Sequence, residues 1–415
     1  MREMKDSGIS WVGEIPKEWS VWRNKYIFKI TKDIVLPSKN YQLLSLTTTG
    51  IKEKDENDNG GKVPENYDGY QVVKENDLVM CLFDLDCSAV FSGLSPYNGM
   101  ISPAYKVLKA KKRIANEQYY RYWFNYVGSK RFYKQYSKSL RFTLNADEFN
   151  RLFSLLPPLD EQQIIAEFLD RECGKIDGLK ADIQAQIDTL EQYKRSIITE
   201  AVTHGLNPSA PMKDSGIPWV GQFPTHWTKK KGKYILRYMS KPVKQDDGVI
   251  TCFRDGEVTL RSNRREDGFT MADKEIGYQG VDVGDLVVHG MDGFAGAIGI
   301  SDSRGKASPV LNVLNTKQNK KYIMYYLRSM AYGEVFTALS TGIRVRSCDL
   351  KWNKLAELLY PLPPIDEQNN IVNYIDEQIA RTNEIIADKK SQIETLDGYK
   401  KSLIYEYVTG KKEVG

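Results

Sequence analysis

The chain has 415 residues, of which 41% are hydrophobic and 27% charged, and its 59 basic and 54 acidic side chains give a formal net charge of +5. These proportions are typical of a folded globular protein, and the length allows two or three domains. The apolar runs are too short for a membrane span and the N-terminus lacks the core of a signal peptide, so we expect a cytoplasmic protein with no membrane partner. Five cysteines without a C-x-x-C pair and three scattered histidines exclude a disulfide scaffold and disfavour a metal site.

The first recognisable element is a block at residues 4–19, MKDSGISWVGEIPKEW, which recurs at 212–227 as MKDSGIPWVGQFPTHW with eleven of sixteen positions identical. A second pair of blocks, LPPLDEQQ at 156–163 and LPPIDEQN at 362–369, has nearly the same offset. The chain is therefore an internal repeat of two similar units with divergent middles. Two copies are too few for a solenoid and indicate a pseudo-two-fold arrangement with two unlike faces.

Residues 20–155 have the pattern of a mixed α/β domain. Strand-like runs at 41–46, 77–83 and 106–108 alternate with turns, and a tyrosine-rich helix is expected within 116–136. Its aromatic residues recur with helical spacing, which favours a place in the core over a base-stacking surface. These aromatics are Tyr119, Tyr122, Trp123 and Tyr126.

The same domain concentrates cations. Residues 105–142 contain eleven Lys or Arg side chains and one acid, Glu117, and basic residues interleaved with aromatics suit contacts to phosphates and bases. Residues 1–155 as a whole hold 24 basic and 18 acidic residues, an excess that is also within the ordinary variation of a globular domain. The candidate DNA contacts in this domain are Lys111, Lys112, Arg113, Arg131, Lys134, Lys138 and Arg141.

Residues 156–206 predict a long helix. Pro157-Pro158 stops any earlier helix, Asp160 is a suitable N-cap, and Gln163 has the capping-box spacing. Apolar residues recur every seven positions here and again after Asp366, which favours an antiparallel helix pair. Two amphipathic helices lying on their own domains are the alternative. The predicted seam residues are Leu169, Ile176, Ile183, Leu190, Ile197, Val372, Ile379, Ile386 and Ile393.

The second middle, residues 207–361, is again basic, with 23 Lys or Arg and 16 Asp or Glu, whereas both predicted helices are acidic. Strands are expected at 285–289 and 297–300 and a helix at 318–332. The glycines between 293 and 299 lack the helix and the acidic residue of a dinucleotide-binding loop, so we interpret them as a β-hairpin. Arginine suits bidentate recognition of guanine, and the candidate DNA contacts are Arg254, Arg261, Arg264, Arg265, Arg304, Arg344 and Arg346.

The chain lacks the motifs of several enzymes. It has no Walker loop, no Asn/Asp-Pro-Pro-aromatic motif of adenine methyltransfer, and no E-x-K group beside Asp84 and Asp86. We therefore predict neither catalytic residues nor metal ligands.

The duplicated D-S-G-I-x-W-V-G-x-x-P-x-x-W block, the duplicated L-P-P-[LI]-D-E-Q block and the linker GLNPSAPM at 205–212 resemble the specificity subunit of type I restriction-modification systems over the whole chain. The resemblance implies an α/β (α+β) fold with two target recognition domains, 1–155 and 207–361. Two conserved helical spacers, 156–206 and 362–415, would form long antiparallel coiled-coil-like helices.

The resemblance also implies a function. Each target recognition domain would recognise half of a bipartite, asymmetric site on double-stranded DNA. The spacers would position two modification (methyltransferase) subunits and the restriction subunits for N6-adenine methylation or cleavage. The chain itself would not be an enzyme, and S-adenosylmethionine, ATP and Mg²⁺ would belong to its partners.

Two other classes of protein remain open. A duplicated nuclease or methyltransferase would act on DNA alone, which incubation with a labelled methyl donor would reveal. A scaffold that binds only protein would keep its behaviour towards DNA when the basic clusters are removed.

Overall fold

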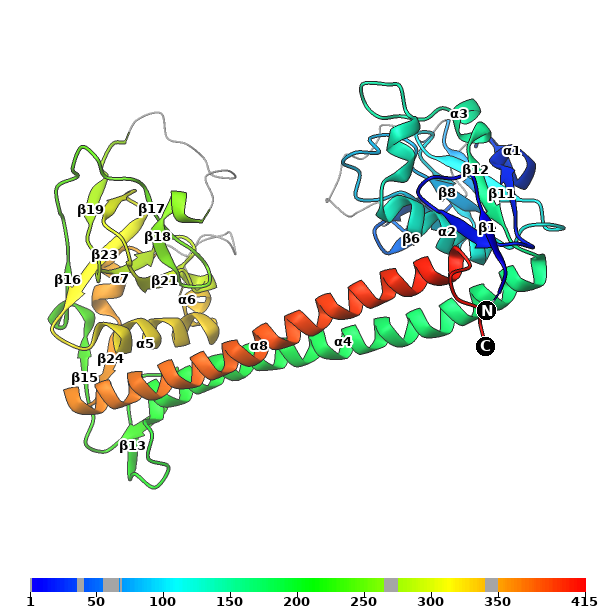
Figure 1. Ribbon diagram of the computed structural model, residues 1–415. Helices are drawn as coiled ribbons and strands as arrows, with labels where there is room; N and C mark the ends of the chain where they lie inside the picture. The colour runs from blue at the N-terminus through cyan, green and yellow to red at the C-terminus, as the bar shows by residue number, and fades with distance from the viewer. Residues whose placement is uncertain (1, 36–40, 55–66, 68, 265–274, 340–349) are drawn as a thin grey trace. The chain divides into compact units, whose positions relative to one another are not determined.

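The structure is a computed structural model that describes residues 2–35, 41–54, 67, 69–264, 275–339 and 350–415. It divides into two compact units, unit 1 (Met1–Ile183 with Ser391–Gly415) and unit 2 (Gln184–Lys390). Two long helices, α4 (Leu159–His204) and α8 (Ile365–Val408), each contribute one half to each unit (Figure 1). A unit is therefore one globular domain together with parts of both helices. Its residues do not match the four consecutive sequence segments predicted above.

Unit 1 contains a four-stranded antiparallel sheet in the order β4-β11-β8-β9. These strands are β4 (Phe28–Thr31), β11 (Lys106–Ala110), β8 (Leu78–Met80) and β9 (Ser92–Leu94). Strand β3 (Ser20–Arg23) pairs with β12 (Phe153–Leu156) and so joins the first repeated block to the segment before α4. The other elements are β1 (Met4–Asp6), β2 (Glu14–Pro16), α1 (Asn24–Ile27), β5 (Leu44–Thr47), β6 (Gly50–Glu53), β7 (Gln71–Val73), β10 (Gly99–Ile101), α2 (Glu117–Ser129), the 3-10 helix η2 (Phe132–Tyr136) and α3 (Ala146–Arg151).

Unit 2 repeats this topology with the sheet order β16-β23-β20-β21. These strands are β16 (Leu236–Tyr238), β23 (Leu311–Thr316), β20 (Leu286–His289) and β21 (Ile298–Ile300). Strand β15 (Thr228–Lys231) pairs with β24 (Leu359–Leu362), as β3 does with β12. The other elements are β13 (Met212–Asp214), β14 (Gln222–Pro224), η3 (Gly232–Tyr234), β17 (Ile250–Cys252), β18 (Val258–Leu260), η4 (Arg261–Asn263), β19 (Gln279–Val281), η5 (Gly293–Ala295), β22 (Gly305–Ala307), α5 (Lys320–Tyr332), α6 (Val335–Ala338) and α7 (Trp352–Glu357).

The tyrosine-rich helices are core elements. Asn116 caps α2 by accepting a hydrogen bond from the Tyr119 N–H (3.0 Å), and Asn319 caps α5 in the same way. The aromatic side chains of α2, including Trp123, are buried in the main hydrophobic core of unit 1. The interpretation of these aromatics as core residues is confirmed, and none of those on α2 offers an exposed ring for stacking on a base.

The long helices begin two residues earlier than the predicted N-caps imply, at Leu159 and Ile365. The N–H of Gln162 donates to the Pro158 carbonyl (2.9 Å), so Pro158 precedes the first helical residue and Asp160 lies in the first turn. The side chain of Gln163 donates to Glu167 (3.0 Å) and closes no capping box. The predicted capping box is therefore wrong, because the shifted start moves both residues out of capping position.

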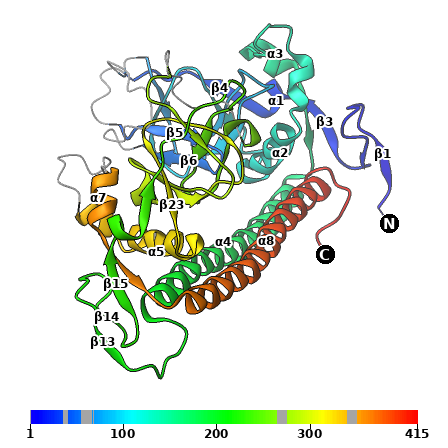
Figure 2. The ribbon, with the colours of Figure 1, turned by 90° about the vertical axis from the view of Figure 1, so that its left-hand side faces the viewer.

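Helices α4 and α8 run antiparallel, side by side (Figure 2). In unit 1, Asp177 pairs with Lys400 (2.6 Å) and Lys180 pairs with Asp397. In unit 2, the side chain of Lys389 donates to Gln186 (2.5 Å) and that of Lys194 donates to Asn383 (2.8 Å). Residue numbers rise on one helix as they fall on the other, so the predicted antiparallel arrangement and the mixed α/β fold are confirmed.

The predicted seam residues have two environments. Near the helix ends they also belong to a domain core, as Leu169 and Ile176 do in unit 1 and Val372 does in unit 2. Both interpretations of the heptads therefore hold, since each helix packs on a domain at its ends and on the other helix. Those buried are Leu169, Ile176, Ile197, Val372 and Ile386, and those partly exposed are Ile183, Leu190, Ile379 and Ile393.

Candidate nucleic-acid interface

The two kinds of repeated block bind each other within each unit. In unit 1 the Trp19 indole N–H donates to Glu161 Oε2 (2.8 Å), and Arg2 forms an ion pair with the same carboxylate. In unit 2 the Trp227 indole N–H donates to Glu367 Oε1 (3.0 Å) and His226 lies 2.7 Å from Oε2. The Trp block and the D-E-Q block are therefore two sides of one structural contact.

The glutamine that follows each of these glutamates ties the helix start to the domain. The side chain of Gln162, which is fully buried, accepts from the Asn116 N–H (2.8 Å) and donates to the carbonyls of Ile114 and Pro157 (both 2.9 Å). Gln368 likewise accepts from the Asn319 N–H (3.0 Å). Sequence reasoning found these blocks as motifs but assigned their glutamines no role beyond helix capping.

Each globular domain makes a hydrogen bond to the C-terminal end of the long helix that belongs to the other repeat. The hydroxyl of Tyr119 donates to the Val408 carbonyl at the end of α8 (3.0 Å), and that of Tyr322 donates to the Val202 carbonyl near the end of α4 (3.1 Å). Gly410 follows with a φ of +69° and lies so close to Pro16 that a side chain there would collide. The repeated motifs thus form a framework, and the side chains that differ between the two repeats remain as the candidates for recognition.

The candidate cations of unit 1 fall at the two ends of α2. Lys111, Lys112 and Arg113 form an exposed turn before α2, next to Ile114, whose carbonyl accepts from the framework residue Gln162. The other four lie beyond the C-terminal end of α2 and are all exposed. We call these four, Arg131, Lys134, Lys138 and Arg141, the basic loop edge. A helix of thirteen residues separates the two groups by about 20 Å, so they are not one continuous contact.

The basic loop edge is built from strained, interlocked loops. The Asp84 N–H donates to the Arg141 carbonyl (3.1 Å) and the Leu85 N–H donates to the Phe142 carbonyl (3.2 Å). Asp84, Arg131 and Phe142 all have positive φ values, between +44° and +53°. Strained non-glycine residues cost free energy and concentrate at functional sites, which favours this edge over the turn at Lys111.

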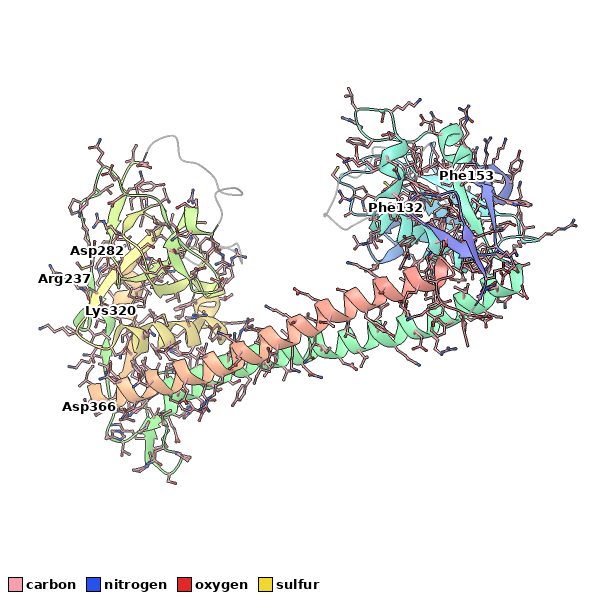
Figure 3. The ribbon with its side chains drawn as sticks, in the orientation of Figure 1. Phe132, Phe153, Arg237, Asp282, Lys320 and Asp366 are labelled. Carbon is pink, nitrogen blue, oxygen red and sulfur yellow. The ribbon has the colours of Figure 1, made fainter. Side chains whose placement is uncertain are left out.

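The first repeated block packs against the basic loop edge and stabilises it. Phe132 of η2 is labelled in Figure 3. Trp11 of the first repeated block stacks on it, with ring centroids 4.3 Å apart, and the Trp11 indole N–H donates to the Tyr136 hydroxyl (3.1 Å). Lys134 of η2 lies 4.5 Å from the centroid of the Phe142 ring. The loop that holds the cations therefore packs on a residue of the repeated block, whose equivalent in unit 2, Trp219, donates instead to the Tyr326 hydroxyl on α5 (2.9 Å).

Three candidate arginines of unit 2 lie on the turn and the 3-10 helix that flank β18. Arg254 is exposed and pairs with Asp292 (2.9 Å), while Arg264 pairs with Asp255 (2.7 Å) and Glu257 (3.0 Å). Arg261 starts η4 and its Nε donates to the Thr251 hydroxyl (3.3 Å). The arginines at positions 265, 344 and 346 lie outside the described residues, and their roles stay predictions.

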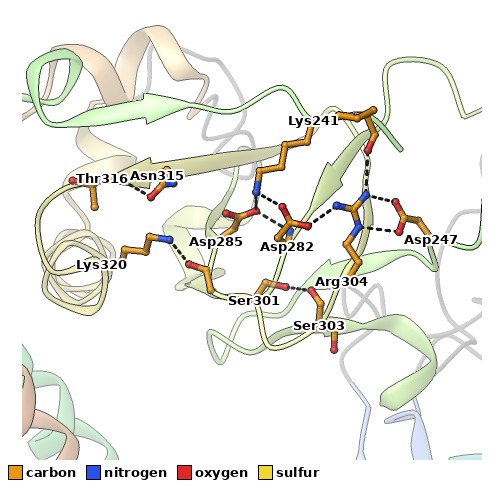
Figure 4. Close-up of polar contacts among 12 residues, drawn as sticks. Lys241, Asp247, Asp282, Asp285, Ser301, Ser303, Arg304, Asn315, Thr316 and Lys320 are labelled. Atoms are coloured by element: carbon orange, nitrogen blue, oxygen red, sulfur yellow. Dashed lines mark hydrogen bonds and ion pairs between the residues drawn. The ribbon is translucent and has the colours of Figure 1, made fainter. Parts of the chain in front are cut away.

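Arg304 belongs to an internal ion-pair network (Figure 4). Its guanidinium donates twice to Asp247 (3.0 and 2.7 Å), pairs with Asp282, and donates to a backbone carbonyl. Lys241 completes the network through Asp282 (2.7 Å) and Asp285. Hydrogen bonding to Arg304 lowers the pKa of Asp247 to about 2. With its donors occupied in this way, Arg304 is the candidate least able to contact a phosphate.

The described part of the chain has no cluster of metal-ligating side chains. No group of three or more His, Cys, Asp or Glu side chains there could hold a metal ion. Burial raises the pKa of Tyr119, Tyr120 and Tyr322, so these phenols act as neutral hydrogen-bond donors. None of the described helices is both long and apolar enough to cross a membrane.

Comparison with known proteins finds relatives of the whole chain, although no family model matches it. A curated protein of Methanocaldococcus jannaschii, assigned as the type I restriction enzyme MjaX specificity subunit, is 22% identical over 441 aligned residues, which cover 97% of this chain and 96% of that protein. A chain from a solved structure on complex assembly and conformational transition of the type I R-M system has a TM-score of 0.67 at 13% identity, covering 96% of this chain and 99% of that one. The crystal structure of the HsdS subunit from Thermoanaerobacter tengcongensis, also 13% identical, covers 96% and 98% at a TM-score of 0.48.

The curated relative has the assignment that the repeated blocks predict, a type I specificity subunit. The chain is thus related over almost its whole length to the specificity subunit of a type I restriction enzyme and has the fold of a chain from a type I restriction-modification structure.

Proposed function

We propose that this chain is the DNA-recognition subunit of a type I restriction-modification complex and acts in the cytoplasm. Each unit recognises one half of a bipartite, asymmetric DNA site. The observation that carries the proposal is the contrast between a framework repeated contact by contact and loop edges that differ between the units. Trp19–Glu161 and Trp227–Glu367 are equivalent, whereas the cations around them are not. Such a molecule presents two unlike recognition surfaces on one constant support, which suits an asymmetric site.

The chain supplies positioning and the partners supply the chemistry. Two modification subunits bind the helical regions and methylate adenine at N6, and restriction subunits add cleavage. S-adenosylmethionine, ATP and Mg²⁺ are held by those partners. The assignment of the curated relative as a specificity subunit supports this division.

The decisive experiment is reconstitution followed by methylome sequencing. The purified chain, the modification subunits and S-adenosylmethionine are mixed with unmethylated DNA, and each component is omitted in turn. We expect N6-methyladenine at one bipartite motif with the full mixture, and no methylation or cleavage by the chain alone.

Two outcomes would contradict the proposal. Activity of the isolated chain would assign it to the enzymes. Methylation at an unchanged motif without this chain would leave it a scaffold that binds only protein.

A further inference from the structure

Unit 2 contains an open cleft of about 740 Å³ between its globular domain and its helical part. Helix α4 contributes Arg195, helix α5 contributes Arg328 and Tyr332, and the turn after β17 contributes Arg254. None of the contacts described above for the framework uses these four side chains. The cleft therefore has the size of a ligand site and an unexplained group of arginines.

Two of these arginines meet at one aromatic ring. The Cζ atoms of Arg195 and Arg328 lie 5.3 and 5.8 Å from the centroid of the Tyr332 ring, and Arg328 Nε donates to the Tyr332 hydroxyl (2.8 Å). No described carboxylate lies within 4.0 Å of either guanidinium. Two positive groups gathered without an anion repel each other, and a bound anion would remove that cost.

The acidic side chains that line the cleft do not form ion pairs with Arg195 or Arg328. Glu191 pairs with Lys194 (2.8 Å) and Asp255 pairs with Arg264 (2.7 Å). The remaining acid, Glu334, is exposed at the cleft and has a positive φ of +56°. Arg195 and Arg328 are thus the described cations of the cleft that form no ion pair within 4.0 Å, although Asp255 is near enough for Arg328 to help lower the pKa of that carboxyl group.

The guanidinium of Arg328 is held in position before any ligand arrives. Its Nη2 donates to the Asp255 carbonyl (2.9 Å), and Gly256, at a φ of +92°, packs directly against it. A side chain at Gly256 would collide with the guanidinium, so the glycine permits this approach. Such fixed donors lower the entropic cost of binding an anion.

The corresponding cleft of unit 1, of about 850 Å³, is a natural control. Its cations are paired within the unit, as Arg121–Asp170, Lys180–Asp397 and Lys400–Asp177. Alignment of the two capped helices places Asn125 where unit 2 has Arg328 and Ser129 where it has Tyr332. The repeated Tyr-Lys pair of the long helices places Lys401 at the position of Arg195. The arginine–tyrosine group is therefore a property of unit 2 alone.

We propose that Arg195 and Arg328 bind a phosphodiester of the DNA backbone, so that helix α4 contacts the nucleic acid together with the second domain. The inference rests on the proposed function and adds a site to it. Guanidinium groups form charge-assisted hydrogen bonds with phosphate oxygens, and a backbone phosphate brings the anion that this cleft lacks. Since Nε and Nη2 of Arg328 already donate to Tyr332 and to the Asp255 carbonyl, Arg328 would contact the phosphate through Nη1. A contact of this kind fixes the register of the DNA on unit 2 and is independent of base sequence.

The test is the salt dependence of binding by the full chain. Binding of a labelled duplex of arbitrary sequence is measured by fluorescence anisotropy between 50 and 300 mM salt, for the parent, Arg195→Gln, and Arg195→Gln with Arg328→Gln. We expect the slope of log K against log salt to fall by about one unit in the double variant, which loses the one phosphate contact, and by less in Arg195→Gln; affinity at 0.1 M salt should fall about five- to tenfold in the double variant. Arg195→Lys should restore most of the slope, and Lys401→Gln, the matched change in unit 1, should leave it unchanged.

The outcomes separate this inference from the proposed function. Parent-like slopes for the double variant, in a chain that binds DNA and keeps the parent's melting temperature, would overturn the phosphate site alone. Absence of DNA binding by the parent, even with the modification subunits, would overturn both proposals. A second arm adds inorganic phosphate at constant ionic strength. If millimolar phosphate abolishes the difference between parent and variants, the site binds free phosphate and the DNA assignment is wrong.

Discussion

At the scale of single residues, the buried glutamine at the start of each long helix contributes more to the free energy of unfolding than the residue that follows it. Gln162 makes three hydrogen bonds that no other side chain can replace, whereas the adjacent Gln163 is exposed. We expect Gln162→Ala to lower the free energy of unfolding by about 2–4 kcal/mol, because it leaves buried backbone groups unpaired. Gln163→Ala should stay within about 0.5 kcal/mol. Urea unfolding followed by circular dichroism measures both, and equal losses would refute the assignment.

A second residue-scale prediction concerns pH. The folded-state pKa of Asp247 is about 2, below its ordinary value of 3.8, because Arg304 donates to the carboxylate. The charged form is thus favoured in the folded state, and its stabilisation is present above about pH 4 and disappears as the pH falls towards 2. Asp247→Asn should therefore cost up to about 2 kcal/mol at pH 7 and progressively less between pH 4 and 2.

The control for this prediction is the neighbouring acid. Asp246 is exposed, and Asp246→Asn should track the parent at every pH. Unfolding curves at pH 2, 3, 4 and 7 measure the free energy of unfolding of the parent and both variants. A constant gap between Asp247→Asn and the parent would show that the carboxylate is not linked to folding.

At the scale of elements, the seam of the helix pair can be tested with adjacent isoleucines. Ile386 is 4% exposed and Ile385 is 46% exposed on the same turn of α8. Ile386→Glu should cost about 3–5 kcal/mol, since it removes a buried aliphatic group and buries a charge, and it should open α8 to trypsin at Lys389 and Lys390. Ile385→Glu should be nearly neutral. Equal protease resistance of both variants would place the seam elsewhere on α8.

The sequence predicts elements well where the signal is local. The heptads and the double prolines place the starts of both long helices to within two residues, and helical spacing identifies the buried aromatics of α2. Contacts between residues far apart in the chain could not be predicted from the sequence. Trp19 and Glu161 are 142 residues apart, so the blocks were visible as repeats but their mutual hydrogen bond was not. Arg304 resembled a DNA-binding residue for the same reason, because its partner Asp247 is 57 residues away.

At the scale of the whole molecule, two unlike units on one framework should allow half of the recognition to be changed alone. The basic loop edge is the part of unit 1 where exposed cations and strained loops coincide, whereas the turn at Lys111–Arg113 adjoins the framework. Replacing Lys134, Lys138 and Arg141 by Gln should therefore weaken or relax one half of the methylated motif and leave the other half intact. Any of the three that contacts phosphate should also reduce the salt slope by about one unit.

The matched control replaces Lys111, Lys112 and Arg113 by Gln, which removes the same charge at the opposite end of α2. Methylome sequencing with the reconstituted complex compares the two triple variants. If the turn variant changes the motif and the loop-edge variant does not, DNA lies against the other end of α2. If both halves of the motif change together in either variant, the units do not recognise half-sites independently, because a contact confined to one unit can alter discrimination only at the bases that unit touches.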